Sequence, residues 1–380
     1  MVVEGGNLGF TQKARVEYAE SGGRINTDAI DNSAGVDCSD HEVNLKILLG
    51  IPIAAGDLTM KQRNELLREV EQDVAAHVLY DNYLQAQILS QEIAVAVDRL
   101  EAYDDLMVQL EAEDLLEREI ESLPSSEQMA ERRRSGRGMA RPELCILLAY
   151  AKRSLEEAIR NSPLPDDPYL DRDLRRYFPA RIVERFGHLI AQHPLRQHLA
   201  STIIANEIVN DLGITWASRL AVETGAEPAE VARAFYIARD VTQAVERWND
   251  VEALDGKIDP VLQNVLMVGV DTLVDDIARW YLQNAPAAPI GETIETVKPL
   301  FTELSEVIER VGSEEARQAR DERVWYLMRQ GIEERLGRRH VYQPELAHGP
   351  DIIAVARETG RTLEDVASTF FLAGERLHLD

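Results

Sequence analysis

Three polar side chains near the N-terminus have the types and spacing of a ligand site. Asn7 follows the glycine-rich segment Glu4-Gly5-Gly6, while Asn32 and Ser39 flank a second segment of turn-forming residues. Amide and hydroxyl groups donate hydrogen bonds, and a helix N-terminus adds free backbone amides that favour a carboxylate or a phosphate. Turn formation and helix capping explain the same spacing, so a binding role and a purely structural role both remain open.

The elements that would carry Asn7 alternate between strand and helix. We expect a strand at Val2-Val3, which ends where an open α/β sheet binds its ligand. A helix should then run over Thr11–Ala19, capped by the threonine and stopped by Gly22-Gly23. Arg24–Ile30 could form a second short strand. Two strands are too few for a complete sheet, so most of that sheet would lie elsewhere.

The elements that would carry Asn32 and Ser39 are a loop and a capped helix. Asp31–Gly35 consists of residues that favour turns. Ser39 and Glu42 have the spacing of a capping box, which predicts a helix that begins at the serine and ends at Gly50. Residues 1–50 are therefore predicted to be a short α/β remnant of a larger domain.

The remainder of the chain has helical periodicity. Thr59 and Gln62 form a second capping box, and an amphipathic stripe follows at Leu67, Val70, Val74 and Val78. Residues 123–142, which contain Arg132–Arg134 and two glycines, are predicted to be an exposed basic loop. Ala285–Gly291 has the composition of a linker. The predicted domains are accordingly 1–50, a helical domain over 51–285, and a helical segment over 286–380.

The composition limits the possible partners. The 380 residues include 67 acidic and 41 basic side chains, a net charge of −26, which disfavours nucleic acid and anionic membrane surfaces. The longest apolar run, Leu144–Ala151, is far shorter than the roughly 20 residues of a membrane span. Cys38 and Cys145 are too few for a disulfide framework or a metal cluster. We expect a cytoplasmic protein without a signal peptide, with reduced thiols and no metal site.

Other polar groups have mainly structural explanations. His188, His193 and His198 point in different directions around a helix, so we expect surface or capping roles rather than a metal site. Asn206 and Asn210 lie among apolar residues, where a hydrogen bond between helices is the leading interpretation and ligand binding the alternative. No complete dinucleotide fingerprint or phosphate loop is present.

The segments VVEGGNLGFTQKAR and GGRINTDAIDNSAGVDCSDHEVNLKILLG resemble the end of the catalytic domain in the large, multidomain NAD-dependent glutamate dehydrogenases of bacteria. The later segments LTMKQRNELLREVEQDVAAHVL, RPELCILLAYAK and IIANEIVNDLG resemble the long C-terminal helical region of that family. The resemblance covers essentially the whole chain. It implies a mostly α fold, in which a multi-helical region follows a short remnant of a Rossmann-like domain.

The resemblance also implies roles for single residues. The smaller hexameric enzymes have a related pattern, by which Asn7 and Asn32 would contact the nicotinamide–ribose end of NAD and Ser39 the side-chain carboxylate of glutamate. This chain departs from that pattern after Ser39, with Asp40-His41-Glu42 in place of aromatic residues. The family also needs a catalytic lysine in a glycine-rich segment, and none of the six lysines here is followed by glycine. We therefore expect no catalytic residue in this chain and no candidate for a desolvated catalytic lysine.

Two functions follow as expectations. In the first, the chain is the C-terminal part of an enzyme that converts L-glutamate, NAD and water to 2-oxoglutarate, ammonium and NADH. The helical region would then pack on an upstream catalytic domain of the same chain, support a homo-oligomer or regulate the enzyme, and this part alone would be inactive. The alternative is an independent helical module that binds a ligand or a protein and has no dehydrogenase activity.

Overall fold

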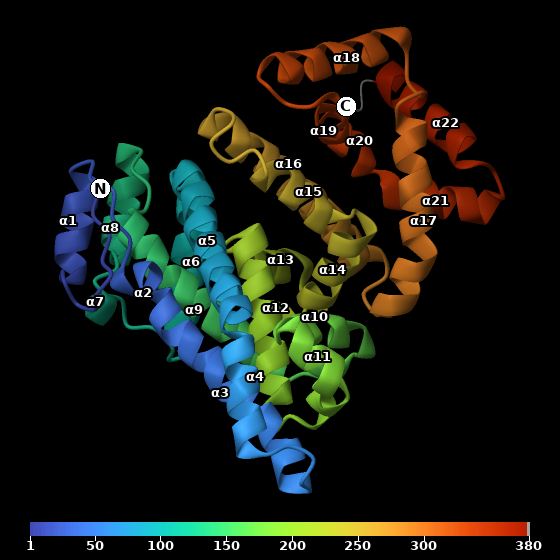
Figure 1. Ribbon diagram of the computed structural model, residues 1–380. Coiled ribbons are helices and arrows are strands. Elements are labelled where there is room, and N and C mark those ends of the chain that lie inside the picture. The colour runs from blue at the N-terminus through green and yellow to red at the C-terminus, as the bar shows by residue number, and fades with distance from the viewer. Residues whose placement is uncertain (378–380) are drawn as a thin grey trace. The chain divides into compact units, whose positions relative to one another are not determined.

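A computed structural model of the protein describes residues 1–377, and these residues are mostly α-helical with no β-strand. The mostly α class predicted from the sequence is therefore confirmed, whereas the α/β remnant is not. The chain packs as two compact units, Met1–Val222 and a second unit that begins at Glu223. Each unit is described separately below (Figure 1).

The first unit is built from helices of very different lengths. Its elements are α1 (Gln12–Glu20), α2 (Asp28–Asp31), α3 (Ser33–Ala55), α4 (Met60–Glu69), α5 (Glu71–Val95), α6 (Leu100–Ala112), α7 (Arg118–Glu121), α8 (Ser126–Ser135), α9 (Arg141–Arg160), η1 (Leu164–Asp166), η2 (Pro168–Leu170), α10 (Asp171–Arg176), α11 (Ala180–Phe186), η3 (Gly187–Gln192) and α12 (Arg196–Leu212). The helix α13 (Trp216–Thr224) follows at the border of the unit.

Four long helices form the frame of the first unit. Helix α9 packs against α12, and α5 contacts α3, α9 and α12 (Figure 1). The apolar run of the sequence lies in α9, where Leu144, Leu147 and Leu148 are almost fully buried. A second apolar cluster joins α3 to α10 and α11 through Leu45, Leu48 and Phe178, among other residues. This frame holds α3 and α5 side by side, and both helices carry residues of the candidate site.

The N-terminal segment is held by side chains where strands were expected. The backbone amide of Val2 donates to the carbonyl of Arg24, but no ladder continues from this bond within the described residues. Instead, the buried Glu4 carboxylate accepts from Arg15 at 2.6 Å, and the Glu4 amide donates to Asp31. The expected strands at Val2-Val3 and Arg24–Ile30 are wrong, because isolated segments cannot satisfy their backbone groups without neighbouring strands.

The helix that carries Ser39 begins earlier and ends later than predicted. Helix α3 starts at Ser33, and Gly56 closes it in the left-handed conformation. The Asn82 side chain donates to the Ile30 carbonyl and to Ser33 Oγ, which ties the start of α3 to α5. Two other boundaries agree with the sequence: Thr11 caps α1, and the Thr59 capping box begins α4.

Residues 123–142 contain a helix where an exposed basic loop was predicted. Ser125 and Gln128 form a capping box at the start of α8. The Arg132 guanidinium is buried and donates to both oxygens of Glu143, at 2.6 and 2.8 Å. The basic cluster therefore includes a residue that anchors α8 to α9.

The second unit is organised around two long helices and their neighbours. Its elements are α14 (Pro228–Val241), α15 (Ala244–Glu252), α16 (Pro260–Asn284), α17 (Ile290–Ile308), α18 (Glu314–Arg329), α19 (Glu334–Val341), α20 (Gln343–Leu346), α21 (Gly349–Thr359) and α22 (Leu363–Leu377). Helix α14 packs against both α16 and α17, and its Phe235 and Tyr236 are fully buried. The predicted linker coincides with the connection between α16 and α17.

The predicted domain borders at residues 50 and 285 fall inside α3 and inside the second unit, respectively. The three predicted domains remain a prediction, whereas the division of the chain into compact units falls between Val222 and Glu223. No helix in the described part of the chain has the length and apolar character that crossing a membrane would require.

Candidate functional site

The first unit contains a cavity of about 1360 Å³ between α3, α5, α9 and α12. Its wall includes both of the asparagines that the sequence singled out, Asn7 and Asn32, as well as a cluster of ionisable side chains. The cavity therefore unites residues from the N-terminal segment with residues of the helical body.

Asn7 and Asn32 meet at the cavity. Asn32 Nδ2 donates to Asn7 Oδ1 at 3.1 Å. Asn32 occupies the N-cap position of α3, although its side chain makes no capping bond. A Cβ atom at Gly35 would lie 3.1 Å from Asn32 Oδ1, so the glycine leaves room for this amide. The structure thus brings the two proposed cofactor contacts together, while their role remains a prediction.

Ser39 lies apart from this pair. It is an exposed residue inside α3, and its hydroxyl donates to the Gly35 carbonyl at 3.2 Å. Ser39 does not line the cavity. The predicted capping box at Ser39 and Glu42 is wrong, because α3 begins six residues earlier at Ser33. Seven residues make about two turns of a helix, so Ser39 and Asn32 still lie on nearly the same side of α3.

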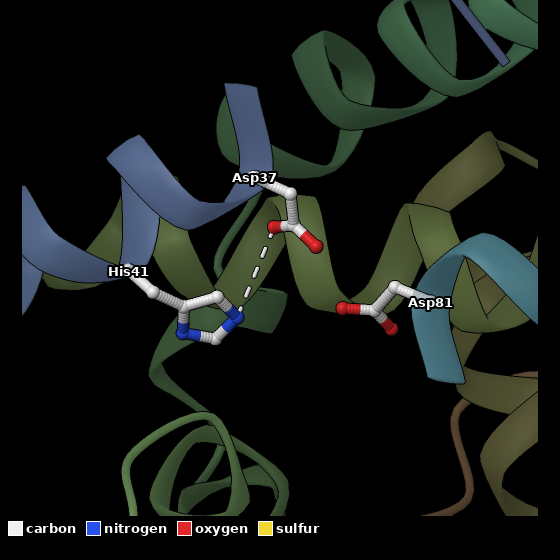
Figure 2. Close-up of side chains that lie close together, drawn as sticks. All are labelled: Asp37, His41 and Asp81. Carbon is white, nitrogen blue, oxygen red and sulfur yellow. Dashed lines mark ion pairs between the residues drawn. The ribbon is translucent and has the colours of Figure 1, made fainter. Parts of the chain in front are cut away.

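Asp37, His41 and Asp81 form a cluster in the cavity wall (Figure 2). Asp37 and His41 are one helical turn apart on α3, and Asp81 comes from α5. His41 Nε2 lies 3.8 Å from Asp37 Oδ1, and one ligand atom from each of the three side chains lies within 4.8 Å of the others. Figure 2 shows His41 and Asp81 pointing toward Asp37 from opposite sides.

Burial strongly changes the acidity of this cluster. Burial, together with the neighbouring Asp37 charge, raises the pKa of Asp81 to about 7. Burial also raises the pKa of Asp37 and lowers that of His41, against the attraction between these two residues. Lys152 of α9 attracts both aspartates, yet burial lowers its pKa to about 8. Shifts of this kind are frequent at functional sites, although structural ion networks also produce them.

Lys152 corrects one conclusion from the sequence. We expected no candidate for a desolvated catalytic lysine, but the Lys152 ammonium faces the cavity and has a lowered pKa. The glycine criterion missed it because burial, rather than a neighbouring glycine, causes the shift. The available signal was its position directly after the apolar run Leu144–Ala151, which buries α9.

Aromatic and polar contacts fix the His41 ring. The Tyr177 ring stacks on it with a centroid distance of 4.3 Å. The Tyr177 hydroxyl donates to Asp40 at 2.7 Å and accepts from Asn44 Nδ2 at 3.0 Å. Burial and the hydrogen bond to Asp40 raise the pKa of Tyr177, so the phenol remains protonated. The imidazole is thus held in one plane beside the cavity.

The other polar groups from the sequence have mixed roles. His193 is buried and contacts the Asn44 carbonyl at 3.2 Å, His188 is exposed, and the exposed His198 lies 3.8 Å from Glu156. Asn206 and Asn210 both line the cavity, and among the described residues Asn210 Oδ1 has no hydrogen-bond partner. The expected hydrogen bond between helices is therefore absent at Asn210 Oδ1, which favours the alternative that this oxygen contacts a ligand.

Comparison with known proteins places this arrangement in a family. A family model described as "Glutamate dehydrogenase, C-terminal" matches residues 136–380, and one described as "Bacterial NAD-glutamate dehydrogenase, catalytic domain" matches residues 1–92. The asparagine pair and the residues Asp37, His41 and Asp81 all lie in the segment that the catalytic-domain model matches.

Similar proteins carry the name NAD-specific glutamate dehydrogenase. That of Halomonas elongata is 38% identical over 380 residues, and that of Pseudomonas aeruginosa is 40% identical over 384 residues; each comparison covers 100% of this chain and 24% of the relative. That of Mycobacterium tuberculosis is 36% identical over 394 residues, which make up 23% of its length. The chain thus spans about a quarter of the length of these relatives. Because the first family model covers more than half of the residues, the chain belongs to the glutamate dehydrogenase C-terminal family.

Proposed function

We propose that the chain is the C-terminal part of an NAD-dependent glutamate dehydrogenase, which oxidises L-glutamate to 2-oxoglutarate and ammonium. The observation that carries this proposal is the Asn7–Asn32 pair at the cavity, within the segment that matches a catalytic domain. NAD would accept the hydride from glutamate. Residues of this chain would bind and orient the reactants, and the base would come from another part of the enzyme.

The asparagine pair fits one end of NAD. The bond between the two amides uses Asn32 Nδ2 and Asn7 Oδ1, which leaves Asn7 Nδ2 as a donor and Asn32 Oδ1 as an acceptor. A donor and an acceptor side by side match the carboxamide and the ribose hydroxyls of the nicotinamide nucleoside. The sequence offers no dinucleotide fingerprint for the pyrophosphate, so the remainder of NAD would be held outside this chain.

Ser39 would bind the other reactant. Its exposed hydroxyl lies about two turns after Asn32 on nearly the same side of α3, about 10 Å further along the helix. That separation suits two groups that contact different molecules. The hydroxyl would donate to the side-chain carboxylate of glutamate in place of the Gly35 carbonyl.

The helical region over residues 51–380 would have a structural or regulatory role in the complete enzyme. We propose that it packs on the upstream catalytic domain of the same polypeptide and supports a cytoplasmic homo-oligomer or a regulatory role. The proposal that the helices form an independent binding module has no observation that favours it over this one.

Substitution of Asn32 in the complete enzyme tests the cofactor role. Asn32→Ala should raise the KM for NAD about three- to tenfold, since a neutral hydrogen bond contributes roughly 0.5–1.5 kcal/mol. The KM for glutamate should change little. The matched control is Asn161→Ala, which alters an exposed asparagine at the C-terminus of α9. Equal kinetics of the Asn32 variant and the wild type would refute the proposed contact.

A further inference from the structure

The residues around Asp37 form two matching pairs on neighbouring helices. Asp37 and His41 are four residues apart on α3, and His77 and Asp81 are four residues apart on α5, so each pair occupies one helix face. A side-chain hydrogen bond joins the two aspartates, and the two imidazole centroids are 5.8 Å apart. The carboxylates of Asp37 and Asp81 therefore face each other, as do the imidazole rings of His41 and His77.

From this geometry we infer that Asp37, His41 and Asp81 bind a divalent transition-metal ion. The inference depends on side chains of α3 and α5 alone and is independent of the proposed dehydrogenase function. One nitrogen and two carboxylate oxygens suit Zn²⁺, Mn²⁺ or Fe²⁺, whereas Mg²⁺ and Ca²⁺ prefer oxygen ligands only.

The second observation is the state of the His41 ring. Its exposed fraction is only 2%, yet neither ring nitrogen has a hydrogen-bond partner among the described residues. Nε2 lies 3.8 Å from Asp37 Oδ1, which is too long for a hydrogen bond. Nδ1, which also lacks a partner among the described residues, faces away from the carboxylates (Figure 2). Buried polar groups are rarely left unpaired. Nε2 points toward the two carboxylates, where a metal ion would supply the missing partner (Figure 2).

The spacing of the ligand atoms is close to that of a bound ion. Two ligands about 2.1 Å from a tetrahedral metal lie about 3.4 Å from each other. The three atoms here lie within 4.8 Å, so side-chain rotations that shorten the longest separation by up to about 1.4 Å would complete the site. The ion would also neutralise the two facing carboxylates, and Tyr177 already holds the imidazole plane.

Lys152 provides the competing explanation. Its ammonium attracts Asp81 and Asp37 and could act as a purely structural counter-ion. However, the described residues include no ion pair that joins Lys152 to either aspartate and no hydrogen bond that joins it to His41. The lysine, as it is placed, thus leaves the imidazole unpaired.

Calorimetric titration of the chelator-treated 380-residue chain with ZnCl₂, in excess Mg²⁺, tests the site. We expect one saturable Zn²⁺ per chain. Asp81→Asn and His41→Gln should each weaken binding at least tenfold, since the loss of even an outer partner of a metal ligand costs ten- to a hundredfold. His188→Gln, which alters an exposed histidine on η3, is the matched control and should bind like the wild type.

Thermal melts followed by circular dichroism establish that the variants are folded, and Asp81→Asn preserves the size of the side chain. Titration with Co²⁺ provides a second readout, because its visible absorption reports the coordination of the bound ion. Wild-type absorption that both cluster variants lose would support the site. Zn²⁺ affinity that is equal in the wild type and both variants would overturn it, as would weak uptake that does not saturate.

Discussion

The Ser39 hydroxyl has a backbone partner of its own within α3, the Gly35 carbonyl, so its proposed binding role can be separated from its structural role. It does not cap the helix, and Ala favours a helix interior over Ser by up to about 0.5 kcal/mol. Ser39→Ala should therefore leave the melting temperature unchanged or slightly higher. In the complete enzyme it should weaken the use of glutamate roughly ten- to a hundredfold, because a hydrogen bond to a charged group contributes about 1.5–3 kcal/mol.

Steady-state kinetics at varied glutamate measure this effect. Ser135→Ala is the matched control, since Ser135 is an exposed serine of α8 that also donates to the carbonyl four residues earlier. If both variants used glutamate as the wild type does, Ser39 would have no part in substrate binding.

The Asp81 carboxyl should make the stability of the first unit depend on pH. Its pKa is about 7 in the folded chain and near 3.8 when unperturbed, so the folded state binds the proton more tightly. Stability from this group is therefore fully present below about pH 4 and is lost as the pH rises to about 7. Relative to Asp81→Asn, the wild type should lose roughly 2–4 kcal/mol over that range.

Denaturant unfolding of both proteins between pH 4 and pH 8 measures the difference. The lowered pKa of His41 makes stability rise with pH below the ordinary pKa of histidine, which is opposite to the effect of Asp81. Lys152 changes the stability with pH only above about pH 8. Subtracting the unfolding free energy of Asp81→Asn from that of the wild type at each pH isolates the contribution of Asp81. Asp105→Asn, which alters an exposed aspartate of α6, provides the control. A pH-independent difference between the wild type and Asp81→Asn would show that the carboxyl is not perturbed.

Residue types predicted part of the site, and spacing could have predicted more. Asn7 and Asn32 were recognised from their positions after turn-forming residues, and they do meet. Asp37 and His41 also carry a signal in the sequence, because a separation of four residues in a helix indicates a shared face. The sequence could not predict that these faces of α3 and α5 pack against each other, because this packing depends on long-range contacts rather than on a local pattern.

At the scale of elements, the junction between α12 and α13 depends on one glycine. Gly213 has φ 98° and ψ 169°, a conformation that is almost restricted to glycine. A Cβ atom there would lie 2.3 Å from Glu92 Oε1. That buried carboxylate accepts from the Ile214 amide at 2.6 Å and from the Tyr103 hydroxyl, so it cannot move away freely.

Gly213→Ala should consequently destabilise the first unit by at least about 2–3 kcal/mol, from backbone strain and the clash together. Gly56→Ala is the matched control in the same unit: its φ is 85°, but a Cβ atom would meet no other atom within 4 Å, so only about 1 kcal/mol is expected. Urea unfolding compares the two variants. Equal losses would mean that the contact with Glu92 contributes nothing.

Helix boundaries were predictable where capping chemistry is local and unpredictable where tertiary bonds decide them. Thr11 and Thr59 begin α1 and α4 as expected. Ser39 has the same capping-box signature, yet α3 starts at Ser33, where Asn82 of α5 holds the preceding turn. Arg132 likewise appeared to be an exposed loop residue until its pairing with Glu143 placed it in the core.

At the scale of the whole molecule, the chain corresponds to one part of its longer relatives. Residues 1–92 match a catalytic domain, but the chain spans about a quarter of the length of its relatives. The sequence contains neither a lysine in a glycine-rich segment nor a dinucleotide fingerprint. Lys152 has a lowered pKa, yet it belongs to helix α9 in the part of the chain that follows the catalytic-domain match.

The most direct test compares glutamate-dependent NADH formation by two purified proteins, the 380-residue chain and the longer polypeptide that contains it. Absorbance at 340 nm with saturating glutamate and NAD measures both. We expect turnover by the longer protein, and no rate above the buffer blank for the 380-residue chain, because we propose that the general base and most of the cofactor site lie outside it. Turnover by the 380-residue chain alone, or an inactive longer protein that is folded and binds NAD, would contradict this account.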